Sequence, residues 1–103
     1  MIDRPRASYD VEWVIKWHRV RALIALAGGD LSVAREAADA AVRAGRATEY
    51  LAYTAEALAD RATVLEAAGQ GAEARADLEA AAGLYHRKGH RVGYARIQER
   101  LAG

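Results

Sequence analysis

A chain of 103 residues has room for one domain, and a net charge of +1 gives it no overall attraction for nucleic acid. The absence of cysteine excludes disulfides and thiolate metal sites, and it fits the cytoplasmic location that we expect. One proline and 26 alanines favour helix almost throughout, and charged residues interrupt the most apolar stretch, residues 11–27, so no membrane span is predicted.

Five helices are predicted from apolar, alanine-rich runs that end at glycine, and they follow a polar N-terminal arm at residues 1–8. Residues 9–102 then form a single helical domain. Asp30 and Thr48 are the expected N-caps, because their side-chain oxygens can accept a hydrogen bond from a free amide of the first turn. Connections this short make successive helices antiparallel neighbours. The predicted ranges are 9–27, 31–44, 48–68, 72–88 and 91–102, and the glycines interpreted as helix ends are Gly28, Gly29, Gly45, Gly69 and Gly89.

The chain matches itself at an offset of 40 residues. The alignment of Gly29 with Gly69 carries more weight than the matched alanines, since alanine is so frequent here. Each unit is a long helix, a tight turn and a second helix, and the fifth helix begins a third unit. Matched alanines let helix backbones approach closely, while larger apolar residues fill the remaining volume. The alanines are Ala22, Ala34, Ala62 and Ala74, and the larger residues are Leu26, Val33, Val42, Leu58, Leu65, Leu78 and Leu84.

The pattern of a small residue, then Gly-Asp or Gly-Gln, then alanine five positions after the glycine resembles the tetratricopeptide repeat (TPR). The resemblance covers residues 19–101 and implies an all-α, right-handed solenoid of two and a half repeats. Residues 48–51, 57–69 and 84–89 are also similar to the C-terminal repeat region of large bacterial signalling regulators, which join an ATPase to a cyclase or a DNA-binding domain. Arg61 departs from the family pattern, which usually has leucine there, and His90 stands where asparagine is common.

In such solenoids the first helix of each unit lines a concave groove, which would suit an extended peptide or another helix. Trp13 and Tyr53 have matching positions in this groove, and both fit a packed core equally well. The positions that the resemblance assigns to the groove are Trp13, Lys16, Arg19, Leu23, Leu26, Tyr53, Glu56, Thr63, Glu66 and Arg96.

The first predicted helix is apolar on nearly its whole circumference, which is typical of a helix with neighbours on several sides. Its apolar residues include Val11, Trp13, Val14 and Trp17, which we interpret as a self-association surface. A second copy, a preceding repeat or another partner would cover it. The alternative is that residues 1–8 fold back over it.

Residues with catalytic or ligand-binding chemistry are sparse. His86 and His90 are separated by Gly89, which ends the helix and breaks the spacing of a metal site on one helical face. Neither Ser8 nor Ser32 lies in a nucleophile motif, and Gly28-Gly29-Asp30 lacks the strand and the lysine of a phosphate loop. We therefore predict no catalytic residue, no metal site and no cofactor.

Charge is uneven along the chain: residues 47–82 carry −5 and residues 83–103 carry +4. The basic cluster consists of Arg87, Lys88, Arg91, Arg96 and Arg100. The sequence favours a non-catalytic protein–protein interaction module of a bacterial regulatory or signalling system. One alternative is a small-ligand site or minor enzyme between the first and third helices, and another is nucleic-acid binding through the basic cluster. The small-ligand pocket would be formed by Trp13, Trp17, His18, Tyr50 and Tyr53.

Overall fold

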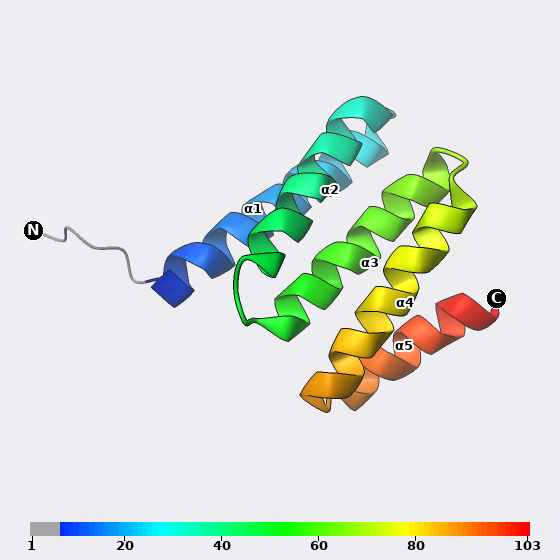
Figure 1. Ribbon diagram of the computed structural model, residues 1–103. Coiled ribbons are helices and arrows are strands. Elements are labelled where there is room, and N and C mark those ends of the chain that lie inside the picture. Colours follow the sequence, from blue (N-terminus) through cyan, green and yellow to red (C-terminus); the bar gives the residue numbers. More distant parts are fainter. Residues whose placement is uncertain (1–6) are drawn as a thin grey trace, which may run out of the picture.

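The computed structural model describes residues 7–103, with side chains from Glu12 onward, and this part of the chain is all helical with no strand (Figure 1). The all-α prediction is confirmed to that extent. Within these residues no helix has both the length and the apolar character needed to cross a bilayer. The helices are α1 (Ala7–Ala27), α2 (Leu31–Arg46), α3 (Leu51–Ala67), α4 (Gly71–Lys88) and α5 (Arg91–Ala102).

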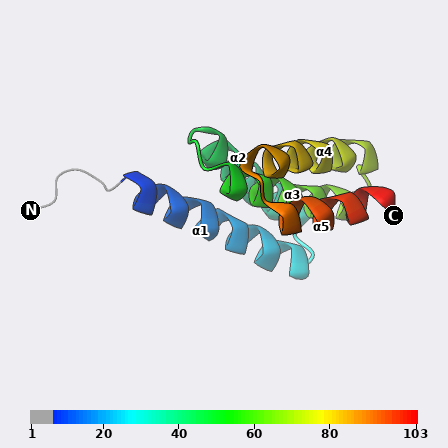
Figure 2. The ribbon, with the colours of Figure 1, turned by 90° about the horizontal axis from the view of Figure 1, so that it is seen from below.

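Each helix packs against the next one along the chain, and α1 also contacts α3. Figures 1 and 2 show α2 and α4 on one side of the molecule and α1 and α5 on the other. The helix α3 lies between the first hairpin, formed by α1 and α2, and the pair formed by α4 and α5. The result is an elongated body, with principal extents of 50, 34 and 17 Å. Both faces of α3 are therefore covered, while α1 and α5 lie at opposite ends of the helix order.

Three of the helix connections use the same left-handed glycine turn. Gly29, Gly69 and Gly89 have φ values of 83°, 79° and 77°, which glycine adopts without steric cost. In each turn the next amide closes back on the helix, as in the bond from Asp30 N to Ala25 O at 2.9 Å. Asp30 also caps α2, because its carboxylate accepts from Val33 N at 3.1 Å. These glycine turns and this cap are as predicted.

The connection between α2 and α3 differs from the prediction. Gly45 does not end the helix: it is buried inside α2, where a Cβ atom would lie 2.7 Å from Thr54 Oγ1 of α3. Thr48 does not cap α3, which begins at Leu51 with Tyr50 at the N-cap position. Instead the Thr48 hydroxyl donates to Gly45 O at 2.8 Å and accepts from Tyr50 N at 3.1 Å. Glycine here permits a close helix crossing, not a turn.

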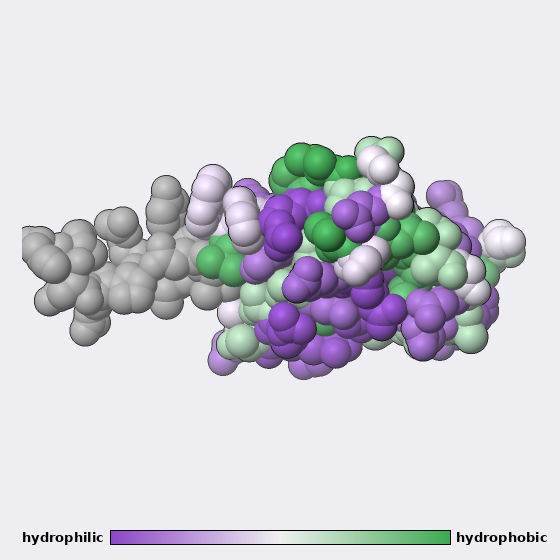
Figure 3. Space-filling view, turned by 90° about the horizontal axis from the view of Figure 1, so that it is seen from above, coloured by the Kyte–Doolittle hydropathy of each residue, from purple (hydrophilic) through white to green (hydrophobic). Residues whose placement is uncertain are grey.

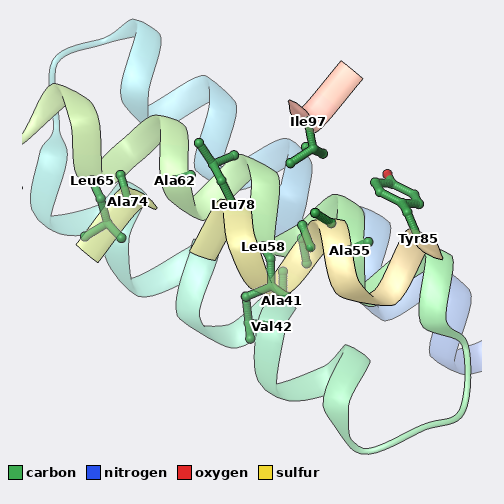
Figure 4. Close-up of a cluster of buried hydrophobic side chains, with 13 residues drawn as sticks. Ala41, Val42, Ala55, Leu58, Ala62, Leu65, Ala74, Leu78, Tyr85 and Ile97 are labelled. Carbon is green, nitrogen blue, oxygen red and sulfur yellow. The ribbon is translucent and has the colours of Figure 1, made fainter. Parts of the chain in front are cut away.

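The core follows the predicted alternation of small and large residues. Ala22, Ala34, Ala62 and Ala74 are almost completely buried where helices cross. The larger of two buried clusters joins α2, α3, α4 and α5, and Leu58 of α3 is at its centre (Figure 4). Of the residues expected to fill the core, Val42, Leu58, Leu65 and Leu78 are buried, whereas Leu26, Val33 and Leu84 are half-buried.

Arg61 links three helices through its guanidinium group. It donates two hydrogen bonds to Asp77 of α4, at 2.7 and 2.9 Å, and a third to Asp39 of α2 at 3.2 Å. Asp77 is buried, and the planar fork of arginine fits its carboxylate well. The departure from the repeat pattern at this position is therefore accommodated by carboxylates on both neighbouring helices.

Candidate interaction surfaces

The outer side of α1 exposes a continuous apolar stripe. Trp13, Trp17, Val20 and Ile24 are 66%, 50%, 54% and 68% exposed, although they are large and apolar. Their spacings of four, three and four residues place them on one helical face. Ile15 and Ala22, which face the body of the protein, are buried. We call Trp13, Trp17, Val20 and Ile24 the α1 stripe. In the space-filling view, hydrophobic residues reach the surface among hydrophilic ones (Figure 3).

The same positions in the second unit are occupied by the residues with which α3 contacts the first hairpin. At the 40-residue offset, the α1 stripe aligns with Tyr53, Ala57, Asp60 and Val64. Ala57 lies in the buried cluster with residues of α2, and Val64 lies in the cluster with Ala22 of α1. Asp60 accepts a hydrogen bond from Arg19 of α1. The α1 stripe is thus the face on which a preceding pair of helices would lie.

The other end of the molecule has no such stripe. Ala55, Leu58 and Ala62 are the buried side of α3 that faces α4, and their counterparts in α5 are Ala95, Gln98 and Ala102. All three counterparts are exposed, and they are small or polar. A polar outer face is how the terminal unit of a helical stack stays soluble. Near the start of α5, the large residues Val92 and Tyr94 are 62% and 37% exposed.

A charged groove lies between α1, α3 and α5, and it holds part of the predicted peptide groove. Arg19 binds Glu56 at 2.6 Å and also Asp60, so its single positive charge offsets one of the two negative charges. Arg96 lines the same hollow of about 260 Å³, and Tyr85 forms part of its wall. Burial raises the pKa of the Tyr85 phenol.

The remaining predicted groove residues do not line this hollow. Thr63 and Glu66 both accept hydrogen bonds from Arg100 at 3.3 Å. Lys16 pairs with Glu12 at 2.9 Å, and this hydrogen bond lowers the pKa of the Glu12 carboxyl. Leu23 is exposed on α1, and Trp13 belongs to the α1 stripe. The prediction omitted Asp60 and Tyr85, because an offset alignment gives helix positions and not the direction of individual side chains. It placed Arg100 in the basic cluster and not in the groove.

The residues of the predicted small-ligand pocket are divided between different surfaces. Tyr50 and Tyr53 line a hollow with Leu51, Ala52 and Lys88, and none of the α1 side chains from Glu12 onward lines it. His18 is half-buried, and among the described residues its buried Nδ1 has no hydrogen-bond partner. Burial, followed by the nearby charges of Arg21 and Arg43, lowers the pKa of His18.

The predicted basic cluster is also divided. Arg87, Lys88 and Arg91 are exposed around the turn between α4 and α5. Arg96 and Arg100 line the groove instead. His90 caps α5, because its Nδ1 accepts from Gly93 N at 3.0 Å, and the centroid of its ring lies 5.0 Å from that of the tilted Tyr85 ring.

The predicted self-association residues Trp13, Val14 and Trp17 are exposed on the outer side of α1, whereas the side chain of Val11 lies outside the described part of the chain. The structure adds Val20 and Ile24, which the same helical spacing would have indicated. Among the described residues, no three His, Asp or Glu side chains are placed to hold a metal ion together. Comparison with protein-family models, curated proteins and solved structures finds no match.

Proposed function

We propose that this chain is a non-catalytic interaction module that binds a protein partner through the α1 stripe. The observation that carries the proposal is that these four exposed positions are equivalent to those by which α3 packs on the first hairpin. The repeat thus presents a helix-binding face at α1. We also propose a TPR-like solenoid as the architecture, and the resemblance of the sequence to bacterial signalling regulators supports a role in a regulatory system.

The chemistry of the stripe favours a protein partner. Trp13 and Trp17 are the residue type most often found at the energetic centre of protein interfaces. Arg21 lies over the Trp17 ring at 5.1 Å, which holds a charged rim beside the apolar centre. An amphipathic helix that offers apolar residues at similar spacing would cover both indoles, together with Val20 and Ile24.

Photo-crosslinking tests the proposal. A photoreactive benzophenone amino acid at Val20 should form adducts with protein in the cells that make this chain. The same group at Val92, which is exposed on α5, serves as the matched control and should form few. Trp17→Glu in the Val20-labelled chain should abolish the adducts, because a buried carboxylate without a partner is costly at an interface. Equal adduct formation from Val20 and Val92, or none from Val20, contradicts the proposed function.

The groove between α1, α3 and α5 is a second candidate site, for an extended peptide. Three arginines (Arg19, Arg96 and Arg100) and two carboxylates (Glu56 and Asp60) line this hollow, an excess of one positive charge that favours a peptide with an acidic side chain. A fluorescently labelled acidic peptide should bind the chain, and Arg96→Ala should weaken binding more than Arg87→Ala, which changes an exposed arginine outside the hollow. Equal losses of peptide affinity in the two variants would show that binding depends only on the overall charge of the chain.

A further inference from the structure

We propose that the partner of the α1 stripe is a second copy of this chain, whose own α1 packs antiparallel to the first about a two-fold axis. This inference rests on the proposed function of the stripe as a protein-binding face, and it names the partner. Its support comes from the order of side chains along the stripe, the charges beside it, and the polar character of the opposite end.

Side-chain size along the stripe fits an antiparallel pair. The two tryptophans occupy its N-terminal half, and Val20 and Ile24 occupy its C-terminal half. In the antiparallel arrangement Trp13 faces Ile24 of the second copy, and Trp17 faces its Val20. Each large ring then meets a smaller branched side chain, so the helices keep an even separation. A parallel pair would put indole against indole at one end and aliphatic against aliphatic at the other.

Charge beside the stripe opposes the parallel arrangement. Spacings of four, three and four residues are those of a coiled-coil seam, in which Lys16 and Arg21 take the flanking positions. In a parallel pair these flanking positions face each other, so Lys16 would meet Arg21 of the second copy on both sides. Glu12, which pairs with Lys16 at 2.9 Å, offsets this repulsion only in part.

In the antiparallel arrangement no like charges face each other across the seam. Lys16 lies beside Leu23 of the second copy, and Arg21 lies beside its Val14. Leu23 and Val14 are both exposed in the single chain. The aliphatic stems of lysine and arginine can cover these apolar residues while their charged groups stay in water. Lys16 and Arg21, which disfavour the parallel pair, therefore enlarge the apolar contact area of the antiparallel pair.

The exposed area is sufficient for a specific dimer. For side chains of about 150–250 Å², the exposed fractions of the α1 stripe with Val14 and Leu23 correspond to about 600 Å² per copy, or about 1,200 Å² for two, at the lower limit of specific interfaces. The end formed by α5 has no matching stripe, and a two-fold contact uses the α1 face of both copies. Assembly therefore stops at two chains and does not continue as a filament.

Cysteine crosslinking tests the arrangement, and the natural chain has no cysteine to interfere. In the antiparallel pair the two copies of residue 20 lie about 4.5 Å apart along the helix axis, whereas the two copies of residue 24 lie about 16 Å apart. With a short bismaleimide, Val20→Cys should link to itself and Ile24→Cys should not. A mixture of Trp13→Cys and Ile24→Cys chains should form the mixed product. Ser32→Cys, exposed on α2, is the background control.

Sedimentation equilibrium on the same proteins supplies the second measurement. The wild-type chain and the cysteine variants should dimerise, and Trp17→Glu should raise the dissociation constant about 100-fold or more while its helical circular dichroism stays unchanged. Self-linking at residue 24 as strong as at residue 20 overturns the antiparallel arrangement. A wild-type chain that stays monomeric at about 100 μM overturns the second copy as partner. If Val20 in cells then crosslinks only to other proteins, the proposed function stands and this inference fails.

Discussion

The two end helices of the molecule, α1 and α5, expose different surfaces. At one end α1 exposes Trp13, Trp17, Val20 and Ile24, while at the other end α5 exposes Ala95, Gln98 and Ala102. The exposed residues of α1 are large and apolar, whereas those of α5 are small or polar. Under the proposed function, only the α1 end is therefore an interface.

The middle helix, α3, makes different contacts on its two sides. Its contacts toward α1 and α2 are alanine packing with a charged pair, and its contacts toward α4 combine an apolar cluster with Arg61 and Asp77. At the 40-residue offset, the α1 stripe aligns with the side of α3 that faces α1 and α2, but the residues of the stripe are larger and more apolar. If burial explains this contrast, substitutions at buried positions should change stability more than substitutions at exposed positions.

Removing the carboxylate of Asp77 should have the largest effect on stability. Asp77→Ala leaves the Arg61 guanidinium half-buried without its main partner, which should lower the free energy of unfolding by about 3 kcal/mol. Urea denaturation followed by circular dichroism measures it. Glu79→Ala, which removes an exposed pair with Arg75, should change stability by less than about 0.5 kcal/mol. Similar losses of stability in both variants would show that the Arg61 guanidinium is hydrated once Asp77 is removed.

Two alanines 40 residues apart allow a direct comparison of the interior with the exposed end formed by α5. Ala62 is buried in α3, and Ala102, 40 residues later, is exposed at the end of α5. Ala62→Trp should overfill a helix crossing and destabilise the fold by about 2 kcal/mol or more, whereas Ala102→Trp should be tolerated. Thermal unfolding measures both. An unchanged melting temperature for Ala62→Trp would mean that the assigned register is wrong.

Two glycines within helices should respond in opposite directions. Gly45→Ala forces a Cβ atom against Thr54, so the fold should lose about 1–2 kcal/mol or α2 and α3 must separate. Gly83 is also inside a helix, but its Cβ direction is open. Gly83→Ala should stabilise the fold by about 0.5–1 kcal/mol through helix propensity. Chemical denaturation of both variants measures the difference. A Gly45→Ala variant more stable than the wild type would show that α2 and α3 do not cross closely at this position.

The smallest expected effect is a pH dependence from His18 in α1. Because burial and two arginines lower its pKa, the folded chain binds fewer protons than the unfolded chain near and below the unperturbed value of about 6.5. Stability from this group is complete above that value and is lost as the pH falls toward the folded-state pKa. The effect should be modest, since the ring is partly exposed. The melting temperature should fall less between about pH 7.5 and pH 5.5 in His18→Gln than in the wild type; equal falls would contradict it.

The helices and their glycine turns could be predicted from sequence because alanine-rich runs, Asp30 and the glycines act locally. Gly45 was misinterpreted because a close crossing depends on Thr54, nine residues away, and not on local preference. The exposed tryptophans were identified from helical spacing alone. Asp60 and Tyr85 were not assigned to the groove, because side-chain direction depends on how α1, α3 and α5 pack.

The most direct test of the account compares one residue at each end. Ile24 of the α1 stripe and Val92 of α5 are 68% and 62% exposed, so exposure alone does not distinguish them. Sedimentation equilibrium of Ile24→Glu, Val92→Glu and the wild type should give a monomer only for Ile24→Glu and dimers for the other two. A monomeric wild type, or equal loss of the dimer in both variants, would contradict the claim that the α1 end alone is the interface.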